Sequence, residues 1–258
     1  MLVLLSPAKD LSDAPVSGVR GTTKPRALDL SVPIAAKLRG MSPRKLGTLM
    51  DISPKLAELN HARFTAWAPP FTVKNAIPAA FTFNGEAYRG LDARTLDADD
   101  LRFAQHHLRI LSGLYGALRP LDLIQAYRLE MGTKLGIGRA KDLYAYWRNT
   151  ITEQLNADLA ANEADVVVNL ASTEYFKAVD TAALKANVVT PVFKDRSASG
   201  SYKVVMVFAK HQRGAMARYI IRHRILEPVL LKRYNEDGYH YAPEESTAQE
   251  WVFLRDRT

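Results

Sequence analysis

The spacing of apolar and polar residues divides the chain into a helix-rich N-terminal half and a strand-rich C-terminal half. In the first half apolar residues recur every three or four positions, and Ser42 and Ser53 each precede a proline, as helix N-caps do. Acidic residues open a further helical pattern at Asp97, where negative charge stabilises a helix N-terminus. Helices are therefore predicted over residues 30–39, 43–50, 54–66, 97–112, 147–160, 182–186 and 211–225.

Runs of β-branched and aromatic residues predict a sheet. The predicted strands are residues 2–5, 166–170, 188–193 and 203–209, and residues 238–241 and 250–255 alternate like a terminal hairpin. Residues 81–88 are aromatic and interrupted by glycine, which predicts a strand or a loop. Because no repeat or linker divides the chain, we expect one mixed α/β domain over residues 1–258, with a central mixed sheet surrounded by helices.

Composition removes several classes of site. The chain of 258 residues contains no cysteine, which excludes disulfides, thiolate metal sites and cysteine nucleophiles. No apolar run reaches the roughly 20 residues that span a bilayer, so we expect no membrane partner and a cytoplasmic location. His106 and His107 are adjacent, and adjacent helical residues do not share a face. We therefore predict no metal site and no cofactor.

The charge balance indicates a polyanionic partner. Lysine and arginine outnumber aspartate and glutamate by 35 to 27, a net charge of +8. Residues 201–233 concentrate the excess, with Glu227 as their only acid. The basic residues of this stretch are Lys203, Lys210, Arg213, Arg218, Arg222, Arg224, Lys232 and Arg233. They form either a basic helix face that follows a sugar-phosphate backbone or a solvated face paired with acids elsewhere.

A second candidate lies in residues 108–132, which turn at Gly113 and Gly116. The sequence Ser112–Gly116 approximates the hairpin of a helix-hairpin-helix element, in which two helices meet at a glycine turn whose amides hold a DNA phosphate. The usual hairpin has one residue between the glycines, whereas this one has two. The alternative is a glycine-containing turn between two helices that only packs.

A third set of polar residues suits an enzyme that acts on nucleotides or nucleic acid. Lys9 follows the first predicted strand, and Asn169 and Tyr175 lie near the end of a later one, where α/β proteins build sites. Arg128 and Glu130 would add charge stabilisation and proton transfer, or would form only a buried ion pair. No Walker A loop and no Gly-x-Ser-x-Gly elbow accompanies them, so a non-enzymatic function is favoured.

Several stretches, spread in order along the whole chain, closely resemble the YaaA family of peroxide-stress proteins. They are LSPAK at 5–9, FNGEAYRGL at 83–91, LRILSGLYGALRPLDLIQAYRLEMG at 108–132, KDLYAYW at 141–147, VVNLASTEYFKAV at 167–179 and AKHQRGAMARYII at 209–221. The resemblance implies a cytosolic bacterial protein of the oxidative-stress response that limits iron-driven DNA damage. It also implies DNA binding through a basic cleft and a helix-hairpin-helix element, within one mixed α/β fold.

The charge pattern and the resemblance together predict largely sequence-independent contacts with the DNA backbone. The residues expected to make them are Arg109, Ser112, Gly113, Gly116, Arg119, Arg128, Lys210, Arg213, Arg218 and Arg222. Direct iron binding would also suit a stress protein, but the chain lacks cysteine and a dense array of His, Asp and Glu ligands.

Overall fold

The computed structural model describes residues 1–16 and 18–256. Its strands are β1 (Leu2–Leu5), β2 (Ile77–Pro78), β3 (Leu108–Ser112), β4 (Gly116–Leu118), β5 (Leu123–Ile124), β6 (Val166–Leu170), β7 (Asn187–Arg196), β8 (Tyr202–Lys203), β9 (His240–Tyr241) and β10 (Glu250–Arg255). Its α-helices are α1 (Leu28–Arg39), α2 (Pro43–Met50), α3 (Pro54–Ala66), α4 (Ala79–Thr82), α5 (Glu86–Leu91), α6 (Ala98–His107), α7 (Leu143–Ala161), α8 (Thr173–Phe176) and α9 (Met206–Arg222). Short 3₁₀ helices cover Ala93–Thr95, Pro228–Arg233, Glu236–Gly238 and Pro243–Glu245.

A mixed sheet forms the centre of the fold, as the sequence predicts. Its strand order is β4-β3-β1-β6-β7-β10-β9, and β8 pairs with β7. The inner strands β3, β1, β6, β7 and β10 run parallel, whereas β4, β8 and β9 pair antiparallel. Parallel strands that are buried on both faces read as continuous apolar runs, and LVLL in β1 and VVVNL in β6 have this form.

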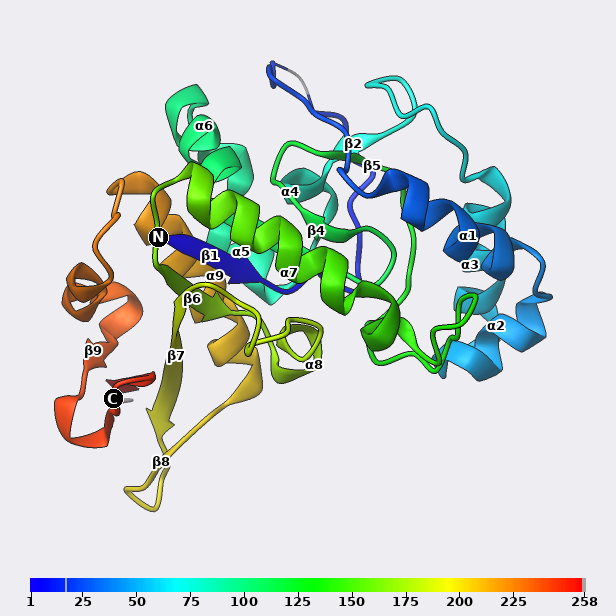
Figure 1. The fold of residues 1–258 in the computed structure, drawn as a ribbon. Helices are drawn as coiled ribbons and strands as arrows, with labels where there is room; N and C mark the ends of the chain where they lie inside the picture. The colour runs from blue at the N-terminus through cyan, green and yellow to red at the C-terminus, as the bar shows by residue number, and fades with distance from the viewer. Residues whose placement is uncertain (17, 257–258) are drawn as a thin grey trace.

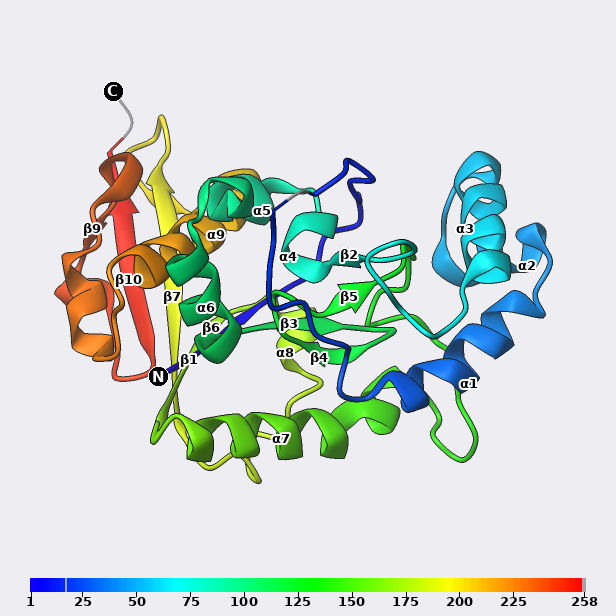
Figure 2. The same ribbon diagram turned by 90° about the horizontal axis from the view of Figure 1, so that it is seen from above.

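Helices cover both faces of the sheet, and three more form a lobe beside it (Figures 1 and 2). The long helix α7 lies along one face, while α5, α6 and α9 lie on the other. Helices α1, α2 and α3 pack together beyond the edge that ends in β4. Among the described residues, no helix combines the length and the apolar character that crossing a membrane requires.

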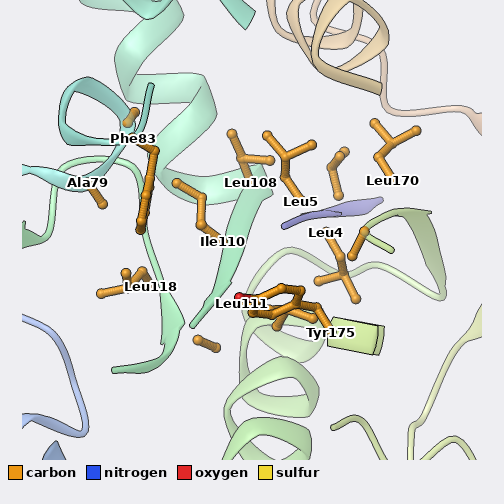
Figure 3. Close-up of a cluster of buried hydrophobic side chains, with 14 of the residues drawn as sticks. Leu4, Leu5, Ala79, Phe83, Leu108, Ile110, Leu111, Leu118, Leu170 and Tyr175 are labelled. Atoms are coloured by element: carbon orange, nitrogen blue, oxygen red, sulfur yellow. The ribbon is translucent and has the colours of Figure 1, made fainter. Parts of the chain in front are cut away.

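The core surrounds β1 (Figure 3). Leu4 and Leu5 are fully buried, with Ile110 of β3 on one side and Leu170 of β6 on the other. Phe83, from the loop between α4 and α5, joins the same cluster. The apolar side chains fix the parallel register of the three central strands, so the carboxyl ends of β1, β3 and β6 meet at one edge of the sheet.

Three sequence predictions were wrong, and a fourth was right only in part. Residues 206–209 open helix α9 rather than continuing a strand, and residues 108–112 form β3 rather than extending α6. Residues 182–186 form turns instead of a helix. Residues 81–88, predicted as a strand or a loop, contain the loop 83–85 between the end of α4 and the start of α5. Each of the first two is a short apolar run, for which periodicity does not separate a buried strand from a buried helix.

Candidate functional site

The segment with two glycines, which the sequence analysis assigned to a turn between helices, is the turn of a β-hairpin. β3 and β4 pair antiparallel, and Ser112 faces Gly116 across the end of the ladder. A Cβ on Gly113 would lie 2.6 Å from the carbonyl oxygen of Leu129, and one on Gly116 would lie 2.8 Å from the Trp147 ring. The helix-hairpin-helix prediction at this place is wrong, and these buried amides are inaccessible to a DNA phosphate.

Arg109 is also buried, with 3% exposure. Its Nε donates to the carboxylate of Asp158 at 2.6 Å, and Arg26 donates to the same carboxylate at 2.8 Å. Burial raises the pKa of Asp158, but hydrogen bonds and charge from the two arginines outweigh it and hold that pKa below its ordinary value. Arg109 therefore joins β3 to α7, and the expectation that it contacts DNA does not fit this fold.

Three further arginines of the predicted DNA-binding set have partners within the fold. Arg119 pairs with the fully buried Asp122 at 2.9 Å. Arg218 donates to the backbone carbonyls at the end of α5, at 3.2 and 3.0 Å. Arg222 lies 3.7 Å from the carboxylate of Asp100 on α6. The second half of α9 thus uses its arginines to hold α5 and α6, with Arg218 on backbone carbonyls and Arg222 on an acid.

Five of the remaining candidates line one cavity of about 340 Å³, namely Lys9, Glu130, Tyr175, Lys210 and Arg213, whereas Arg128 and Asn169 do not line it. It lies where β1 and β6 end, at residues Leu5 and Leu170, and is closed by α5 and by the first half of α9. Crevices at the carboxyl ends of parallel strands are the usual ligand sites of open α/β sheets. The charged residues that line it are Lys9, Asp10, Glu86, Arg89, Glu130, Glu174, Lys210 and Arg213.

Glu130 forms ion pairs with two other residues of the predicted enzyme set, Lys9 and Arg128. Its carboxylate lies 2.9 Å from Lys9 Nζ and 3.4 Å from a terminal nitrogen of Arg128. Arg128 is largely shielded, and its Nε is buried without a hydrogen-bond partner among the described residues. Lys9, by contrast, has 60% of its side chain exposed. The ion pair of Arg128 and Glu130 that the sequence analysis left as an alternative is therefore present, and Glu130 also pairs with Lys9 at the cavity.

Two serines connect the ends of β1 and β6. Ser6 Oγ accepts the N–H of Ser172 at 2.8 Å and donates to its hydroxyl at 3.3 Å. The Tyr88 hydroxyl donates to the carbonyl oxygen of Ser6 at 3.0 Å, which ties α5 to the same point. These bonds fix the backbone of the cavity floor, and the sequence analysis assigned no role to Ser6 or Tyr88.

Asn169 supports the backbone next to the cavity, whereas Tyr175 lines the cavity itself. Asn169 is buried in β6 and accepts the N–H of Ala171 at 3.1 Å, so it shapes the turn that leads out of the strand. Tyr175 lines the cavity and is 8% exposed. Burial, followed by the neighbouring Tyr127 and two carboxylates, raises the pKa of Tyr175 well above its ordinary value. Its hydroxyl therefore stays neutral and can donate a hydrogen bond.

Arg213 reaches the cavity because α5 and α9 pack with almost no space between their backbones. A Cβ on Gly214 would lie 1.6 Å from the carbonyl oxygen of Ala87, and one on Gly90 would lie 2.2 Å from that of His211. Burial lowers the pKa of Arg213, and no acid within the described residues forms an ion pair with it. Gly214, a glycine inside the predicted helix 211–225, was the available signal for this contact.

A second hollow of about 530 Å³ adjoins the cavity, since Glu130 and Glu174 line both. It extends along residues 132–134 to the end of α2 and to Asp51. The Glu174 carboxylate, which both hollows share, accepts the N–H of Gly132 at 2.9 Å. Together the two hollows form a groove that leads from the carboxyl ends of the strands towards the lobe formed by α1, α2 and α3.

Helices α2 and α3 are joined by only three residues, Asp51 to Ser53. Asp51 takes a left-handed conformation, with φ of 50°, and ends α2. Ser53 caps α3 by accepting the N–H of Leu56 at 3.4 Å. Gly47 of α2 faces Ala57 of α3, and a Cβ on Gly47 would make an ordinary contact with the Ala57 side chain at 3.5 Å. The sequence analysis predicted both helices and their caps but assigned no function to the pair.

The part of the chain that the structure describes contains no cluster of metal ligands. There, no group of three or more His, Asp and Glu side chains is arranged to hold an ion.

Comparisons with known proteins identify the family. Residues 1–245 match the family described as peroxide stress protein YaaA. A protein of Ralstonia pickettii printed as "UPF0246 protein" is 50% identical over 258 residues, which cover 100% of both chains. Proteins of the same printed name from Paracidovorax citrulli and Cupriavidus metallidurans are 52% and 49% identical, and each match covers 99% of this chain and 98% of the relative. The chain therefore belongs to the peroxide stress protein YaaA family.

Proposed function

We propose that this member of the peroxide-stress family binds the DNA backbone in the cytoplasm through the helix pair α2–α3. One observation carries the proposal: Arg44, Lys45 and Lys55 are exposed on the pair, and none has an acid within ion-pair distance in the described chain. Unpaired surface cations near a helix N-terminus favour phosphate, since the first amides of a helix lack partners within it.

The shape of the pair also supports the proposal. A hollow of about 520 Å³ lies between the two helices and is lined by Arg44 of α2, by Ile52 of the turn, and by Pro54 and Glu58 of α3. A phosphate there would contact the guanidinium and the start of α3 together, with one carboxylate beside them. The resemblance to the family implies a helix-hairpin-helix element, and this pair, rather than the buried hairpin of β3 and β4, takes that role in our proposal.

A salt titration tests DNA binding. Duplex affinity is measured by fluorescence anisotropy at several salt concentrations for the unchanged protein and for the triple variant Arg44→Gln, Lys45→Gln, Lys55→Gln. The variant should bind more weakly, and its slope of log affinity against log salt should shrink by up to about 2.7, since each lost phosphate contact removes about 0.9. Lys185→Gln, an exposed lysine at the amino edge of the sheet, is the matched control. Equal slopes for the triple variant and the unchanged protein would refute the proposal.

The cavity favours a second candidate function, an enzyme that acts on nucleotides or nucleic acid. The supporting observation is the convergence of Lys9, Glu130 and Tyr175 on one enclosed space beside Arg128. Such a set combines cations that stabilise negative charge with groups that exchange protons. The test is product analysis after incubation with nucleotides and oligonucleotides, with Glu130→Gln as the inactive comparison; no product from the unchanged protein would remove this candidate.

A further inference from the structure

Lys210 and Arg213 place two positive charges on the same side of the cavity. They are three residues apart on α9, which puts both side chains on one face of the helix, and both line the cavity. Arg213 is partly buried and has no acidic partner among residues 1–16 and 18–256. A shielded cation without a counter-ion is unfavourable, so an anion from outside the chain would stabilise this arrangement. The planar guanidinium is suited to the oxygens of a phosphate.

Carboxylates also line the cavity, from Asp10, Glu86, Glu130 and Glu174. Glu130 is shared with Lys9 and Arg128, while Glu174 uses one oxygen to accept the N–H of Gly132. A carboxylate accepts several hydrogen bonds, so both retain capacity for donors on a bound molecule. Sugar hydroxyls are donors of this kind, and acidic residues recognise the ribose in many nucleotide sites. An inorganic anion would leave these carboxylates without such donors.

The volume limits what can enter. At about 340 Å³, the cavity is at the small end of the range of roughly 300–1,000 Å³ found for small-molecule sites. That space suits one nucleotide and excludes a duplex. The partly exposed apolar residues Pro7, Ala8 and Ala87 on its wall offer contact for an uncharged ring.

We propose that the cavity binds a single nucleotide, with its phosphate on Lys210 and Arg213 and its sugar hydroxyl at Glu130 and Glu174. Two sources offer this chemistry: a free mononucleotide, or the 3′-terminal nucleotide of a DNA strand, which carries a phosphodiester and a free 3′-hydroxyl. The groove that leads to α2 gives a strand a path to the cavity. The inference deepens the second candidate function and does not depend on DNA binding by α2–α3.

Calorimetric titration of the full chain with AMP and with adenosine tests the nucleotide site. AMP should bind and adenosine should bind at least tenfold more weakly, because it lacks the phosphate. Arg213→Gln should weaken AMP binding by about 10- to 100-fold, the usual effect of losing a hydrogen bond to a charged group. Lys210→Gln, at an exposed position, should weaken it in the same direction without a folding defect. Lys185→Gln should leave it unchanged.

Anisotropy with oligonucleotides separates the two sources. If a DNA terminus is bound, a single strand that ends in a 3′-hydroxyl should bind more tightly than the same strand ending in a 3′-phosphate, and Arg213→Gln should abolish the difference. If only free nucleotides are bound, the two strands should bind equally while AMP binding persists. Absence of AMP binding together with equal binding of the two strands overturns the proposal, as does an unchanged AMP affinity in both Arg213→Gln and Lys210→Gln.

The triple variant in α2 and α3 distinguishes the nucleotide site from the proposed duplex-binding site. It should lose duplex affinity and retain AMP affinity, whereas Arg213→Gln should show the reverse. Failure of the nucleotide site therefore leaves the duplex result intact.

Discussion

Gly214 of α9 faces the backbone of Ala87 in α5 so closely that a Cβ on the glycine would lie 1.6 Å from the Ala87 carbonyl oxygen. Gly214→Ala must therefore push the two helices apart. We expect this variant to lose about 3 kcal/mol or more of its free energy of unfolding, at or above the upper end for overpacked sites, as measured by urea denaturation. Because Arg213 is the preceding residue, AMP binding should weaken as well.

Gly40→Ala is the control for that substitution. A Cβ on Gly40 would lie 3.6 Å from the Lys37 carbonyl oxygen, which is an ordinary contact, and φ at Gly40 is −74°. Its free energy of unfolding should change by less than about 0.5 kcal/mol, as for most surface substitutions. Equal stability of Gly214→Ala and Gly40→Ala would show that α5 and α9 are not packed this closely in solution.

Asp158 makes the protein sensitive to acid. Its pKa in the folded state lies below its ordinary value, because the bonds from Arg109 and Arg26 outweigh the effect of burial. A group with a depressed pKa stabilises the fold above its unfolded pKa, near 3.9, and this contribution is lost as the pH falls through the folded pKa. Asp158→Asn should therefore be less stable than the unchanged protein at pH 7, and the difference should shrink in acid.

The size of the loss at neutral pH follows from the buried partner. Removing one member of a buried ion pair costs about 3–5 kcal/mol, because Arg109 is left without a counter-charge. Thermal unfolding at pH 7 and at pH 3 measures both values. Asp99→Asn serves as the control, since Asp99 pairs with Arg102 on the surface and should contribute about 1 kcal/mol or less. A pH-independent difference for Asp158→Asn would contradict the role assigned to its charge.

A substitution at Gly116 distinguishes the β-hairpin of this structure from the helix-hairpin-helix turn that the sequence suggested. The φ of Gly116 is 72°, and a Cβ there would lie 2.8 Å from the Trp147 ring, so Gly116→Ala should strain the turn and displace the indole. We expect a loss of about 1–3 kcal/mol of unfolding free energy and altered tryptophan emission. At temperatures where the variant is folded, the salt slope of duplex binding should be unchanged; a reduced slope would restore the phosphate-binding role of the turn.

Sequence patterns predicted the elements whose signals are local. The strands β1 and β6 are apolar runs bounded by turn residues. The helices α2 and α3 begin at prolines that directly follow the capping residues Ser42 and Ser53, so the capping signals and the apolar pattern predict the same helices. The mixed sheet itself followed from the alternation of such elements. Apolar runs without caps, such as residues 206–209, could belong to either type of element, and packing against the sheet decided between them.

The candidate site was predicted in part. Lys9 and Tyr175 were selected because they follow strands, and the structure brings them to one cavity because β1 and β6 are parallel neighbours. Arg213 was selected as a DNA contact from its charge, yet its position depends on α9 crossing α5, which no local pattern reveals. Arg109 shows the same limit, since only the fold places Asp158 beside it. Charge along a sequence does not distinguish a surface cation from a buried one.

A substitution at Asp51 tests the helix pair α2–α3, because it is expected to make duplex DNA bind more tightly. Asp51 is exposed in the turn between α2 and α3, and its left-handed backbone, with φ of 50°, is a conformation that asparagine also tolerates. Asp51→Asn removes a negative charge from the turn next to the proposed phosphate site without requiring a new backbone shape. Like charges about 4 Å apart in water repel by about 1 kcal/mol, so duplex affinity should rise by up to about fivefold at low salt.

The gain should fade as salt screens the charge, which distinguishes it from a change of fold. Glu153→Gln makes the same change of charge at an exposed position of α7, on a different helix of the fold, and should alter affinity much less. Both variants are compared by anisotropy at low and at physiological salt, with thermal unfolding to confirm equal stability. An equal gain from both would mean that overall charge, rather than the turn between α2 and α3, governs the attraction of DNA.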